Sequence, residues 1–341
     1  MKEIGTVAVI FGEVPPGARD DEKDVLVEVD AVTEVLHSRG IAAVPVPVTL
    51  DMAVMLDRIR ACRADLVFNL VESINGIDRL NVIAPLVLET GPAPFTGGGA
   101  TAMCVTSNKV LTKSVLRHHG IPTPWWQAQV PVYDLPPGME FPCIVKPVDS
   151  EASRCIDDQA VCRSRPELER RIGQMNAGGE SWYIERFVDG REFNISVMET
   201  ARGPAVLPPA EVLFNDFPAG KPAIVGYRAK WAPESFEYVH TPRTFDFPAS
   251  DNGLLDRLGE LSLGCWNAFG LQGYARVDFR VDAYGEPTVL EINLNPCISP
   301  DAGFPAAAQR AGYAYDAMVM TIIDTAYNRN RTLYAADNRS S

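Results

Sequence analysis

The sequence predicts a protein of mixed architecture, with a parallel α/β unit first and α+β units after it. Two observations carry this prediction. Residues 4–72 alternate short apolar runs with stretches whose apolar residues recur at helical spacing, which is the pattern of parallel strands joined by crossover helices. The later chain has short strand-like segments joined by tight turns, which favour antiparallel hairpins. Its 341 residues suffice for about two to three domains and a large core.

The first unit is expected to alternate strands with helices. The run IGTVAVIF has the character of a buried strand that stops at Gly12, and the helix after it is expected to end at Gly40, since glycine favours helix C-termini. The expected strands span 4–11, 41–48 and 64–72. The expected helices span 22–40, 52–62 and 81–91.

A turn-rich stretch at 92–100 leads into the later units. A helix is expected over 107–120, with Ser107 as its N-cap and Gly120 at its C-terminus. Residues 201–250 are rich in proline and are expected to be mostly loops. The remaining expected elements are strands at 141–147, 182–188 and 193–199, a hairpin within 273–297, and helices at 252–270 and 312–330.

The composition argues against several classes of function. A formal net charge of −13 disfavours binding to nucleic acid or to an anionic membrane, which requires a basic face. The seven cysteines include no CxxC pair and the four histidines show no HExxH spacing, so a disulfide framework or a thiolate zinc site is not expected. The N-terminus runs straight into a strand, and no apolar run reaches the roughly 18 residues of a membrane span. We therefore expect a cytoplasmic protein without a signal peptide.

The hairpin within 273–297 crowds two carboxylates onto one face. Its strands alternate apolar and polar residues, and the turn DAYGEP is expected to pair Asp282 with Pro287. That register pairs residue 280 with 289, 278 with 291 and 276 with 293. Asp278 and Glu291 would then have Cβ atoms roughly 5 Å apart, which is destabilising for like charges. A divalent cation reverses that sign, and two carboxylates with the amide of Asn293 suit magnesium. The alternative is a solvated face neutralised by Arg276 and Arg280.

Three lysines and two glutamates are candidates for a nucleotide site. Lys146 follows a core-like strand, Lys109 lies on a helix and Lys230 lies in GYRAKW. A lysine suits phosphate as a compact point charge, although each alone is commonly a surface residue. Glu185 and Glu192 flank a turn, where they would either meet ribose hydroxyls or be exposed acids of a plain hairpin. No P-loop and no GxGxxG pattern is present, so a nucleotide site would be of another kind.

Together these segments resemble the ATP-grasp superfamily, and more closely the D-alanine–D-alanine ligase group. The resemblance extends from about residue 4 to 328, over the segments PAPFTGGGATAMCVTSNKVLTKSVLRHHGIPTP, CIVKP, YIERFVDGREF, GYRAKW, ARVDF and LEINLNPC. It implies an ATP-grasp fold in which two α+β subdomains sandwich ATP. The implied division is an N-terminal α/β substrate-binding domain at 1–100, a central subdomain at 101–188, a C-terminal subdomain with the metal site at 189–330, and a disordered tail at 331–341.

The resemblance also implies roles for individual residues. Glu185 and Glu192 would frame the adenosine, with main-chain groups of Arg186 and Val188 at the adenine. The whole implied ATP site comprises Lys109, Lys146, Ser153, Glu185, Arg186, Val188, Glu192 and Lys230. Two magnesium ions, replaceable by manganese, would be held by Asp278, Glu291 and Asn293. Arg276 and Lys230 would be catalytic, with Arg276 stabilising an anionic tetrahedral intermediate beside a backbone N–H of the NPC turn.

Both implied substrate subsites depart from the family's pattern. Cys155 stands where the phosphate loop usually has a glycine, Cys297 replaces the glycine that follows the metal-binding asparagine, and Ala302 lies near the usual position of a serine. The GG-x-S-x-E motif is not kept, and Glu13 is offered as a substitute for its glutamate. Trp231 stands where the closing loop often has tyrosine. Glu13, Trp231 and Cys297 are therefore candidate substrate contacts.

We expect an ATP-dependent carboxylate–amine ligase that forms a peptide bond through an acylphosphate, on small amino acids or carboxylates other than a D-alanine pair. The alternatives are an authentic D-alanine–D-alanine ligase and a non-catalytic nucleotide-binding protein, although the latter would be expected to have lost a metal ligand. Catalysis through Cys297 ranks lower, because no histidine lies near it in sequence. Trp125 and Trp126 are either packing residues or signs of a larger, apolar substrate. The resemblance suggests a homodimer.

Overall fold

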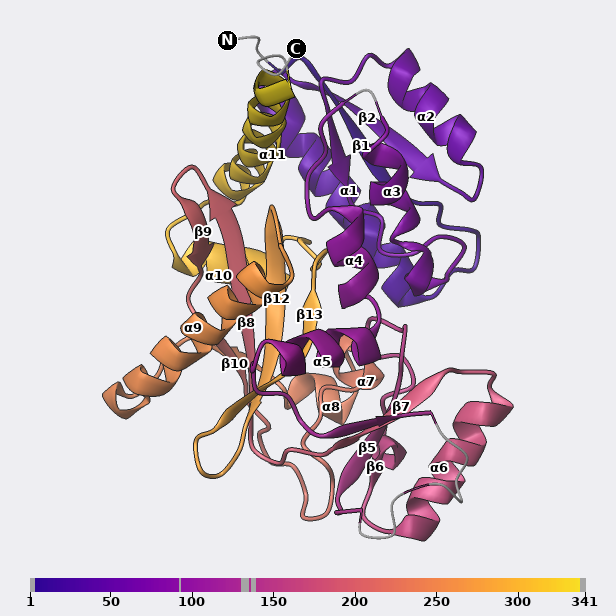
Figure 1. The fold of residues 1–341 in the computed structure, drawn as a ribbon, viewed down its shortest axis with the longest axis vertical. Coiled ribbons are helices and arrows are strands. Elements are labelled where there is room, and N and C mark those ends of the chain that lie inside the picture. The colour runs from indigo at the N-terminus through magenta and orange to yellow at the C-terminus, as the bar shows by residue number, and fades with distance from the viewer. Residues whose placement is uncertain (1–3, 92, 130–134, 136–138, 338–341) are drawn as a thin grey trace.

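The computed structural model describes residues 4–91, 93–129, 135 and 139–337, and three sheets succeed one another along its length (Figure 1). A parallel sheet lies at one end, a six-stranded antiparallel sheet in the middle and a four-stranded antiparallel sheet at the other end. This mixture confirms the predicted combination of α/β and α+β architecture. Among the described residues, no helix is both long and apolar enough to cross a membrane.

The first sheet is parallel, in the order β2-β1-β3. Its strands are β1 (Thr6–Gly12), β2 (Ala42–Val48) and β3 (Leu66–Asn69). Its helices are α1 (Asp20–Ser38), α2 (Met52–Ala61) and α3 (Ile83–Leu88), joined by the C-terminal α11 (Tyr315–Asp337). Val7 and Val9 pack toward α1 and α11, whereas Ala8 and Ile10 pack toward α2 and α3. The central strand is apolar throughout because both of its faces are covered.

The four-stranded sheet has the order β4-β7-β5-β6. Its strands are β4 (Trp126–Ala128), β5 (Cys143–Pro147), β6 (Val161–Cys162) and β7 (Trp182–Arg186). Helix α6 (Arg165–Ala177) covers one face, with Leu168 and Ile172 packed against Val145 and Ile184. The apolar residues of α6 recur at helical spacing and so form a single buried stripe.

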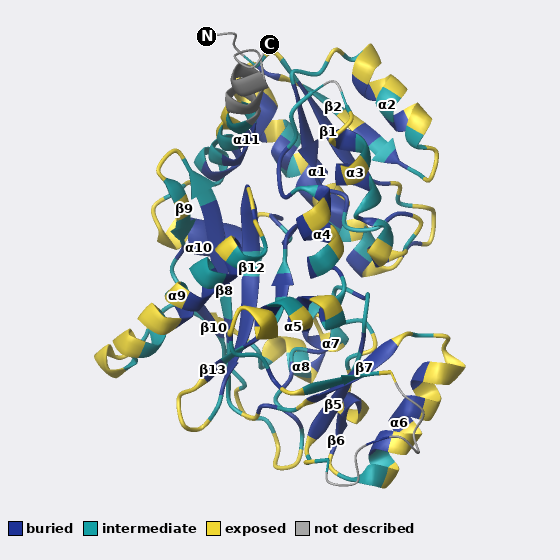
Figure 2. Ribbon diagram, in the orientation of Figure 1, coloured by how far each residue is buried: buried dark blue, intermediate teal, exposed yellow. Residues whose placement is uncertain are grey.

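The six-stranded sheet has the order β11-β10-β8-β12-β13, and β9 pairs with β8. Its strands are β8 (Arg191–Thr200), β9 (Gly203–Val206), β10 (Ala210–Val212), β11 (Arg243–Thr244), β12 (Tyr274–Val281) and β13 (Pro287–Asn293). Helix α9 (Asn252–Ala268) packs Leu258 and Cys265 against Ile195 and Val277. The buried strands and the exposed outer face of α9 are visible in Figure 2.

Several short helices complete the described chain. They are α4 (Ala100–Thr106), α5 (Lys109–His118), α7 (Tyr227–Trp231), α8 (Phe236–Val239) and α10 (Gly303–Arg310). Short 3-10 turns lie at Asp78–Leu80, Asp158–Ala160 and Ala249–Asp251. The sequence did not lead us to expect α4, α6 or α10, nor the short strands and helices within the proline-rich stretch 201–250. Short elements of this kind depend on tertiary packing more than on local pattern.

Two expected helix boundaries are wrong. Helix α5 is capped by Asn108, whose side chain accepts from the N–H of Leu111 at 3.0 Å, and not by Ser107, which ends α4. At the other end of the chain, α11 continues to Asp337. The expected disordered tail from residue 331 is therefore wrong up to Asp337, and 338–341 lie outside the described residues.

The expected hairpin register is confirmed at the carboxylates and wrong toward the turn. Arg276 pairs with Asn293 and Asp278 with Glu291, as predicted. Phe279 then pairs with Val289, so Leu290 is an extra residue, and the turn-side pairs are 280 with 288 and 281 with 287. This β-bulge shifts the register by one residue. Val289 is also bonded outside the hairpin, since its N–H donates to the Pro122 carbonyl at 2.8 Å.

Candidate active site

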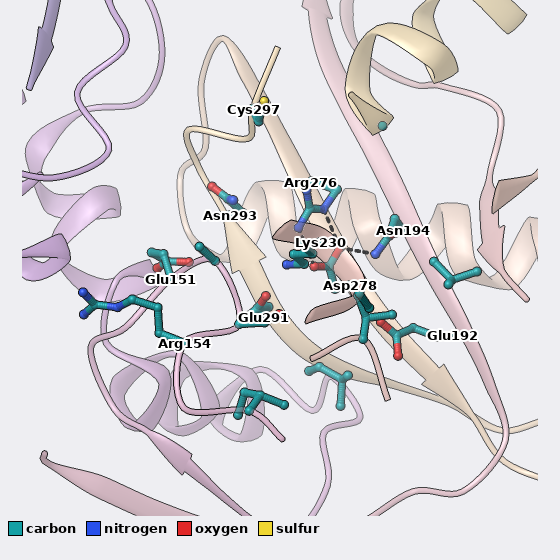
Figure 3. A pocket seen from close by; sticks show the side chains of 18 of the residues that line it. Glu151, Arg154, Glu192, Asn194, Lys230, Arg276, Asp278, Glu291, Asn293 and Cys297 are labelled. Atoms are coloured by element: carbon teal, nitrogen blue, oxygen red, sulfur yellow. Dashed lines mark hydrogen bonds and ion pairs between the residues drawn. The ribbon is translucent and has the colours of Figure 1, made fainter. Parts of the chain in front are cut away.

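A cavity of about 760 Å³ is lined by residues of α1, α5, β5, β7, β12 and β13 and of the loops between them. Its lining includes every candidate for the ATP, metal, catalytic and substrate sites named from the sequence except Glu13. These residues are Lys109, Lys146, Ser153, Glu185, Arg186, Val188, Glu192, Lys230, Trp231, Arg276, Asp278, Glu291, Asn293 and Cys297. Figure 3 shows the labelled part of this wall, with side chains from both strands of the hairpin facing Glu151 and Lys230.

Asp278 is buried and is held by two polar neighbours (Figure 3). Arg276 donates to both of its oxygens, from Nε at 2.7 Å and from Nη2 at 2.8 Å, and Asn194 Nδ2 donates to Oδ1 at 2.8 Å. Asp278 therefore does not lie on a solvated face, and the alternative based on solvation is wrong for this residue. The alternative was correct in expecting Arg276 to neutralise a carboxylate of the hairpin, because Arg276 neutralises Asp278.

Glu291 is the second carboxylate of the hairpin and is surrounded by positive charge. Lys109 Nζ lies 3.4 Å from its Oε2. Burial opposes ionisation of Glu291, but the charges of Lys109, Lys230 and Lys146 outweigh it and lower its pKa to about 2. The carboxylate is thus ionised at neutral pH and is available as an oxygen ligand.

Glu185 lies beneath the lysines and does not face the cavity as a free acid. Its buried carboxylate forms ion pairs with Lys146 and with Lys113, whose Nζ lies 2.5 Å away. Burial opposes ionisation of Glu185, but these two lysines outweigh it and lower its pKa. We did not single out Lys113 from the sequence. Its i, i+4 spacing from Lys109 on α5 was the available signal, because it places both on one helix face.

Glu192 pairs with Arg280 at 2.8 Å, and Arg280 also donates to the Gly190 carbonyl at 3.0 Å. The expectation that Arg280 neutralises the hairpin carboxylates is therefore wrong. Burial raises the pKa of Glu192 even though Arg280 opposes that shift. In the strand before it, the N–H of Arg186 donates to the Trp125 carbonyl at 2.9 Å, and both Arg186 and Val188 line the cavity.

The loop at 150–156 meets the helix that carries Lys230. Lys109 Nζ donates to the Ser150 carbonyl at 2.6 Å, and Trp231 Nε1 donates to the Ala152 carbonyl at 3.2 Å. Ser153 and Cys155 both have φ of 57°, a left-handed conformation that glycine adopts more easily. The cysteine found in place of the expected glycine thus keeps the backbone shape that a glycine would favour.

Glu13 and the two tryptophans of the sequence analysis lie elsewhere. Glu13 is exposed and lines a smaller neighbouring cavity, which shares Glu72 and Glu151 with the large one. Neither Trp125 nor Trp126 is among the described residues that line the large cavity. Trp125 is 46% exposed, so it is not a packing residue either.

Cys297 lies in the cavity wall as a protonated thiol. Its Sγ donates to Asp24 Oδ2 at 3.0 Å. Burial, together with the negative charges of Glu28 and Glu72, raises its pKa well above the ordinary value. A nucleophilic cysteine requires a thiolate, and the described residues that line the cavity include no histidine to act as its base. This argues against catalysis through Cys297.

Comparisons with known proteins agree with this arrangement. A family model described as the D-ala D-ala ligase C-terminus matches residues 125–324. The D-alanine–D-alanine ligase of Methylococcus capsulatus is 29% identical over 333 residues, or 95% of this chain and 97% of that protein. The uncharacterized protein y4sG of Sinorhizobium fredii is 29% identical over 266 residues, or 77% and 75% of the two chains. The solved structure of the Bacillus anthracis D-alanine–D-alanine ligase complexed with ATP has a TM-score of 0.75 at 21% identity, covering 97% and 99% of the two chains.

Proposed function

Because the chain belongs to the D-Ala–D-Ala ligase family of ATP-grasp proteins, we propose that it joins a carboxylate to an amine through an acylphosphate, on substrates other than a D-alanine pair. As a member of this family it is an ATP-dependent ligase that forms a C–N bond. The observation that carries the proposal is a single cavity that combines oxygen donors on a hairpin with three lysines. A non-catalytic nucleotide-binding protein would not need this combination.

The donors of the hairpin fit magnesium. Asp278, Glu291 and Asn293 supply two carboxylates and an amide, which are hard oxygen ligands, and Glu291 is ionised by its neighbours. We propose that these three residues hold two magnesium ions, for which manganese substitutes. When bound, the metal spreads the negative charge of the transferring phosphoryl group.

The lysines are proposed to hold the ATP phosphates. Lys109, Lys146 and Lys230 all line the cavity, and Lys109 and Lys146 are fixed by carboxylates or carbonyls behind them. A side chain fixed before binding loses less entropy when phosphate arrives. Glu185 therefore acts on ATP through the lysines that it positions, while Glu192, Ser153 and main-chain groups at 186 and 188 are proposed to contact the nucleotide directly.

The chemistry proceeds in two displacements. A substrate carboxylate oxygen attacks the γ-phosphorus, the bond from phosphorus to ADP breaks, and an acylphosphate forms. The amine then attacks the acyl carbon, gives a tetrahedral oxyanion, and expels phosphate as the amine proton is lost. Arg276 is proposed to stabilise that oxyanion, because its half-buried guanidinium is fixed by Asp278 and the residue lines the cavity.

Departures at both substrate subsites support a substrate other than a D-alanine pair. Cys297 and Ala302 line the cavity where the family pattern has glycine and serine, and Glu13 lies outside the cavity. The named relatives favour the second candidate, an authentic D-alanine–D-alanine ligase. A cytoplasmic location and a homodimeric state remain predictions. Light scattering of the purified chain measures its molar mass and so tests whether it is a homodimer.

The test is ADP release from Mg-ATP in the presence of pooled amino acids and small acids, followed by mass spectrometry of the product. We expect release with a pool other than D-alanine alone, and a product whose mass equals the two substrates less one water. Efficient release with D-alanine as the sole amino acid would establish the second candidate. Release of ADP without any condensed product would refute ligation.

A further inference from the structure

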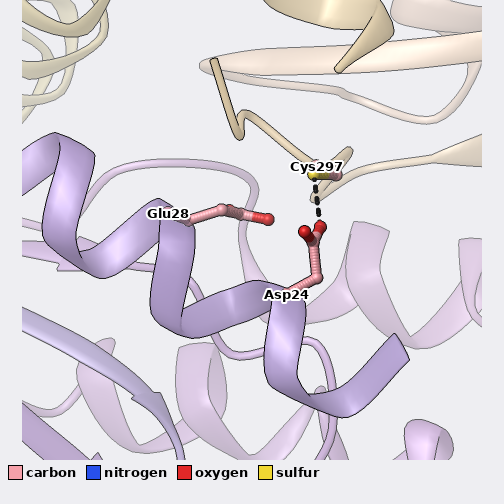
Figure 4. Close-up of side chains that lie close together, drawn as sticks. All are labelled: Asp24, Glu28 and Cys297. Carbon is pink, nitrogen blue, oxygen red and sulfur yellow. Dashed lines mark hydrogen bonds between the residues drawn. The ribbon is translucent and has the colours of Figure 1, made fainter. Parts of the chain in front are cut away.

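Three ionisable residues of the cavity wall, Asp24, Glu72 and Cys297, interact with a fourth, Glu28, which is buried and is not among the residues that line the cavity. Asp24 and Glu28 lie on successive turns of α1, Glu72 lies just after β3, and Cys297 follows β13. We call Asp24, Glu28 and Glu72, with Cys297, the acidic corner. The ligand atoms of Asp24, Glu28 and Cys297 all lie within 4.8 Å of one another, and Figure 4 shows the three side chains pointing together.

The acidic corner has no ion-pairing cation among the described residues. In the part of the chain that the structure describes, no lysine, arginine or histidine forms an ion pair with Asp24, Glu28 or Glu72. Three other carboxylates of the cavity differ in this respect, since Asp278 pairs with Arg276 and the carboxylates of Glu185 and Glu192 also have basic partners. The carboxylates of the corner therefore lack the paired cations that Asp278, Glu185 and Glu192 have.

Glu28 provides a second and independent observation. Glu28 is only 2% exposed, and its Oε1 has no hydrogen-bond partner among the described residues, although Cys297 and the backbone of Ile298 bond to its carboxyl group. It points toward Asp24 and Cys297 (Figure 4). A buried, unsatisfied carboxylate oxygen is costly unless a donor reaches it from a ligand. Burial and the charge of Asp24 raise the pKa of Glu28 to about 8, and burial with the charges of Glu28 and Asp24 raises that of Glu72.

We propose that the acidic corner binds an ammonium or guanidinium group of the substrate, so that at least one substrate is a basic amino acid. This inference rests on the proposed function and names the class of its substrate. Asp24, Glu72 and Cys297 line the same cavity as Asp278 and Glu291, so one molecule can present a carboxylate to the metal ligands and a cation to the corner. The α-ammonium of a neutral amino acid supplies one cation, and a basic side chain supplies a second, whose charge would favour the ionised forms of Glu28 and Glu72.

A divalent metal is the competing occupant of the same atoms. The bond from Cys297 to Asp24 disfavours it, because the thiol is protonated and donates, whereas a metal requires the thiolate. An organic cation offers several N–H donors and leaves the thiol as it is. The corner thus fits an organic cation without any change in the protonation of Cys297.

The test is isothermal titration calorimetry of the full chain with Mg²⁺ and a non-hydrolysable ATP analogue. Lysine and arginine, in both chiralities, are compared with norleucine, which has a similar shape but a neutral side chain. We expect one basic amino acid to bind at least about tenfold more tightly than norleucine, because norleucine forms none of the charged hydrogen bonds that a basic side chain forms with the corner. Norleucine that binds as tightly as the basic amino acids would overturn the inference, and so would absence of binding by every basic amino acid.

Two variants test whether Glu28 and Glu72 are the residues that bind the basic amino acid. Glu28→Gln and Glu72→Gln should each weaken binding of the basic amino acid about tenfold or more and leave nucleotide affinity unchanged. Asp30→Asn, on the exposed side of the same helix, is the matched control and should behave as wild type. Unchanged affinity in both corner variants refutes the inference. A different result would assign the corner to a metal. In that case Zn²⁺ or Mn²⁺ would bind wild type but not Glu28→Gln, and neither lysine nor arginine would bind.

The two proposals can fail separately. Release of ADP with neutral amino acids, without preference for basic ones, would refute the acidic corner and keep the ligase. Binding of lysine or arginine that depends on Glu28 and Glu72, without ADP release with any acid and amine, would keep the corner and refute the proposed reaction.

Discussion

At the scale of the residue, the carboxylates of the hairpin are stabilised by neighbouring cations. Asp278 is bound by Arg276, and Glu291 lies beside Lys109. Two carboxylates at directly opposed positions of a hairpin would otherwise repel each other. The charges that make this arrangement stable come from β12 itself and from α5, so the site is assembled only when these elements meet.

Glu291→Gln should reduce magnesium-dependent ATP turnover by at least about 100-fold, since the metal's contribution to charge stabilisation is worth several kcal/mol. The change keeps the shape of the side chain, so the thermal unfolding midpoint should move little. Glu286→Gln, in the exposed turn of the same hairpin, is the control and should retain wild-type turnover. Normal ATP turnover in Glu291→Gln would remove the hairpin from the metal site.

Glu28 should make stability depend on pH. Burial and Asp24 raise its pKa to about 8 from an ordinary value of 4.5. The folded chain thus holds this proton more tightly than the unfolded chain, so the stabilisation is full below about pH 4.5 and is lost as pH rises through about 8. The ionisable groups that face Glu28 are Asp24, Glu72, Cys297, Tyr274 and Tyr315.

Urea unfolding between about pH 5 and 8 measures this dependence. The free energy of unfolding of wild type should fall with rising pH more steeply than that of Glu28→Gln, by up to about 1.4 kcal/mol per pH unit for one proton. Parallel curves for the two proteins would show that Glu28 is ionised in the folded state at an ordinary pKa.

The sequence predicted the opposed carboxylates but not their partners. Alternation along two strands was enough to place Asp278 opposite Glu291. It was not enough to find Lys113 beneath Glu185 or Arg280 beside Glu192, because these pairs join residues 72 and 88 positions apart in the chain. The acidic corner was missed for the same reason, since α1 and the segment after β13 meet only in the folded protein.

At the scale of the element, the hairpin and the helix α7 shape the site. The bulge at Leu290 coincides with contacts from outside the hairpin, because Val289 is bonded on both sides by Pro122 and Thr123. A register derived from the turn alone cannot include such contacts. Helix α7 is likewise fixed by its neighbours, through Trp231 and through Tyr227, whose N–H donates to the Ile156 carbonyl at 3.1 Å.

Trp231→Phe should raise the KM for ATP about fivefold, because it removes one hydrogen bond, worth about 1 kcal/mol, between α7 and the loop at Ala152. The phenyl ring keeps the apolar contacts, and kcat should change less than KM. Steady-state kinetics with varied ATP measures both constants. Trp125→Phe serves as the control because Trp125 lies outside the described cavity wall. An unchanged KM in Trp231→Phe would mean that this bond does not position the nucleotide loop.

At the scale of the whole molecule, the sequence predicted a parallel α/β unit followed by antiparallel hairpins, and the structure contains both. The periodicity of the apolar residues predicted the parallel sheet and the later hairpins, because such periodicity indicates which faces of helices and strands are buried. The division into domains at 1–100, 101–188 and 189–330 remains a proposal. One feature that no local pattern contained is the return of α11 to the first sheet, where Val319 and Ile322 share a core with Val7 and Val32.

The central claim is that a substrate carboxylate is activated by phosphorylation, and transfer of oxygen tests it most directly. The substrate identified by ADP release is labelled with ¹⁸O in the carboxylate that reacts, and the phosphate released is analysed by mass spectrometry. The account predicts one ¹⁸O atom in each phosphate per turnover, because the oxygen that attacks phosphorus leaves with it. Phosphate without label, formed at the same rate as the condensed product, would contradict an acylphosphate.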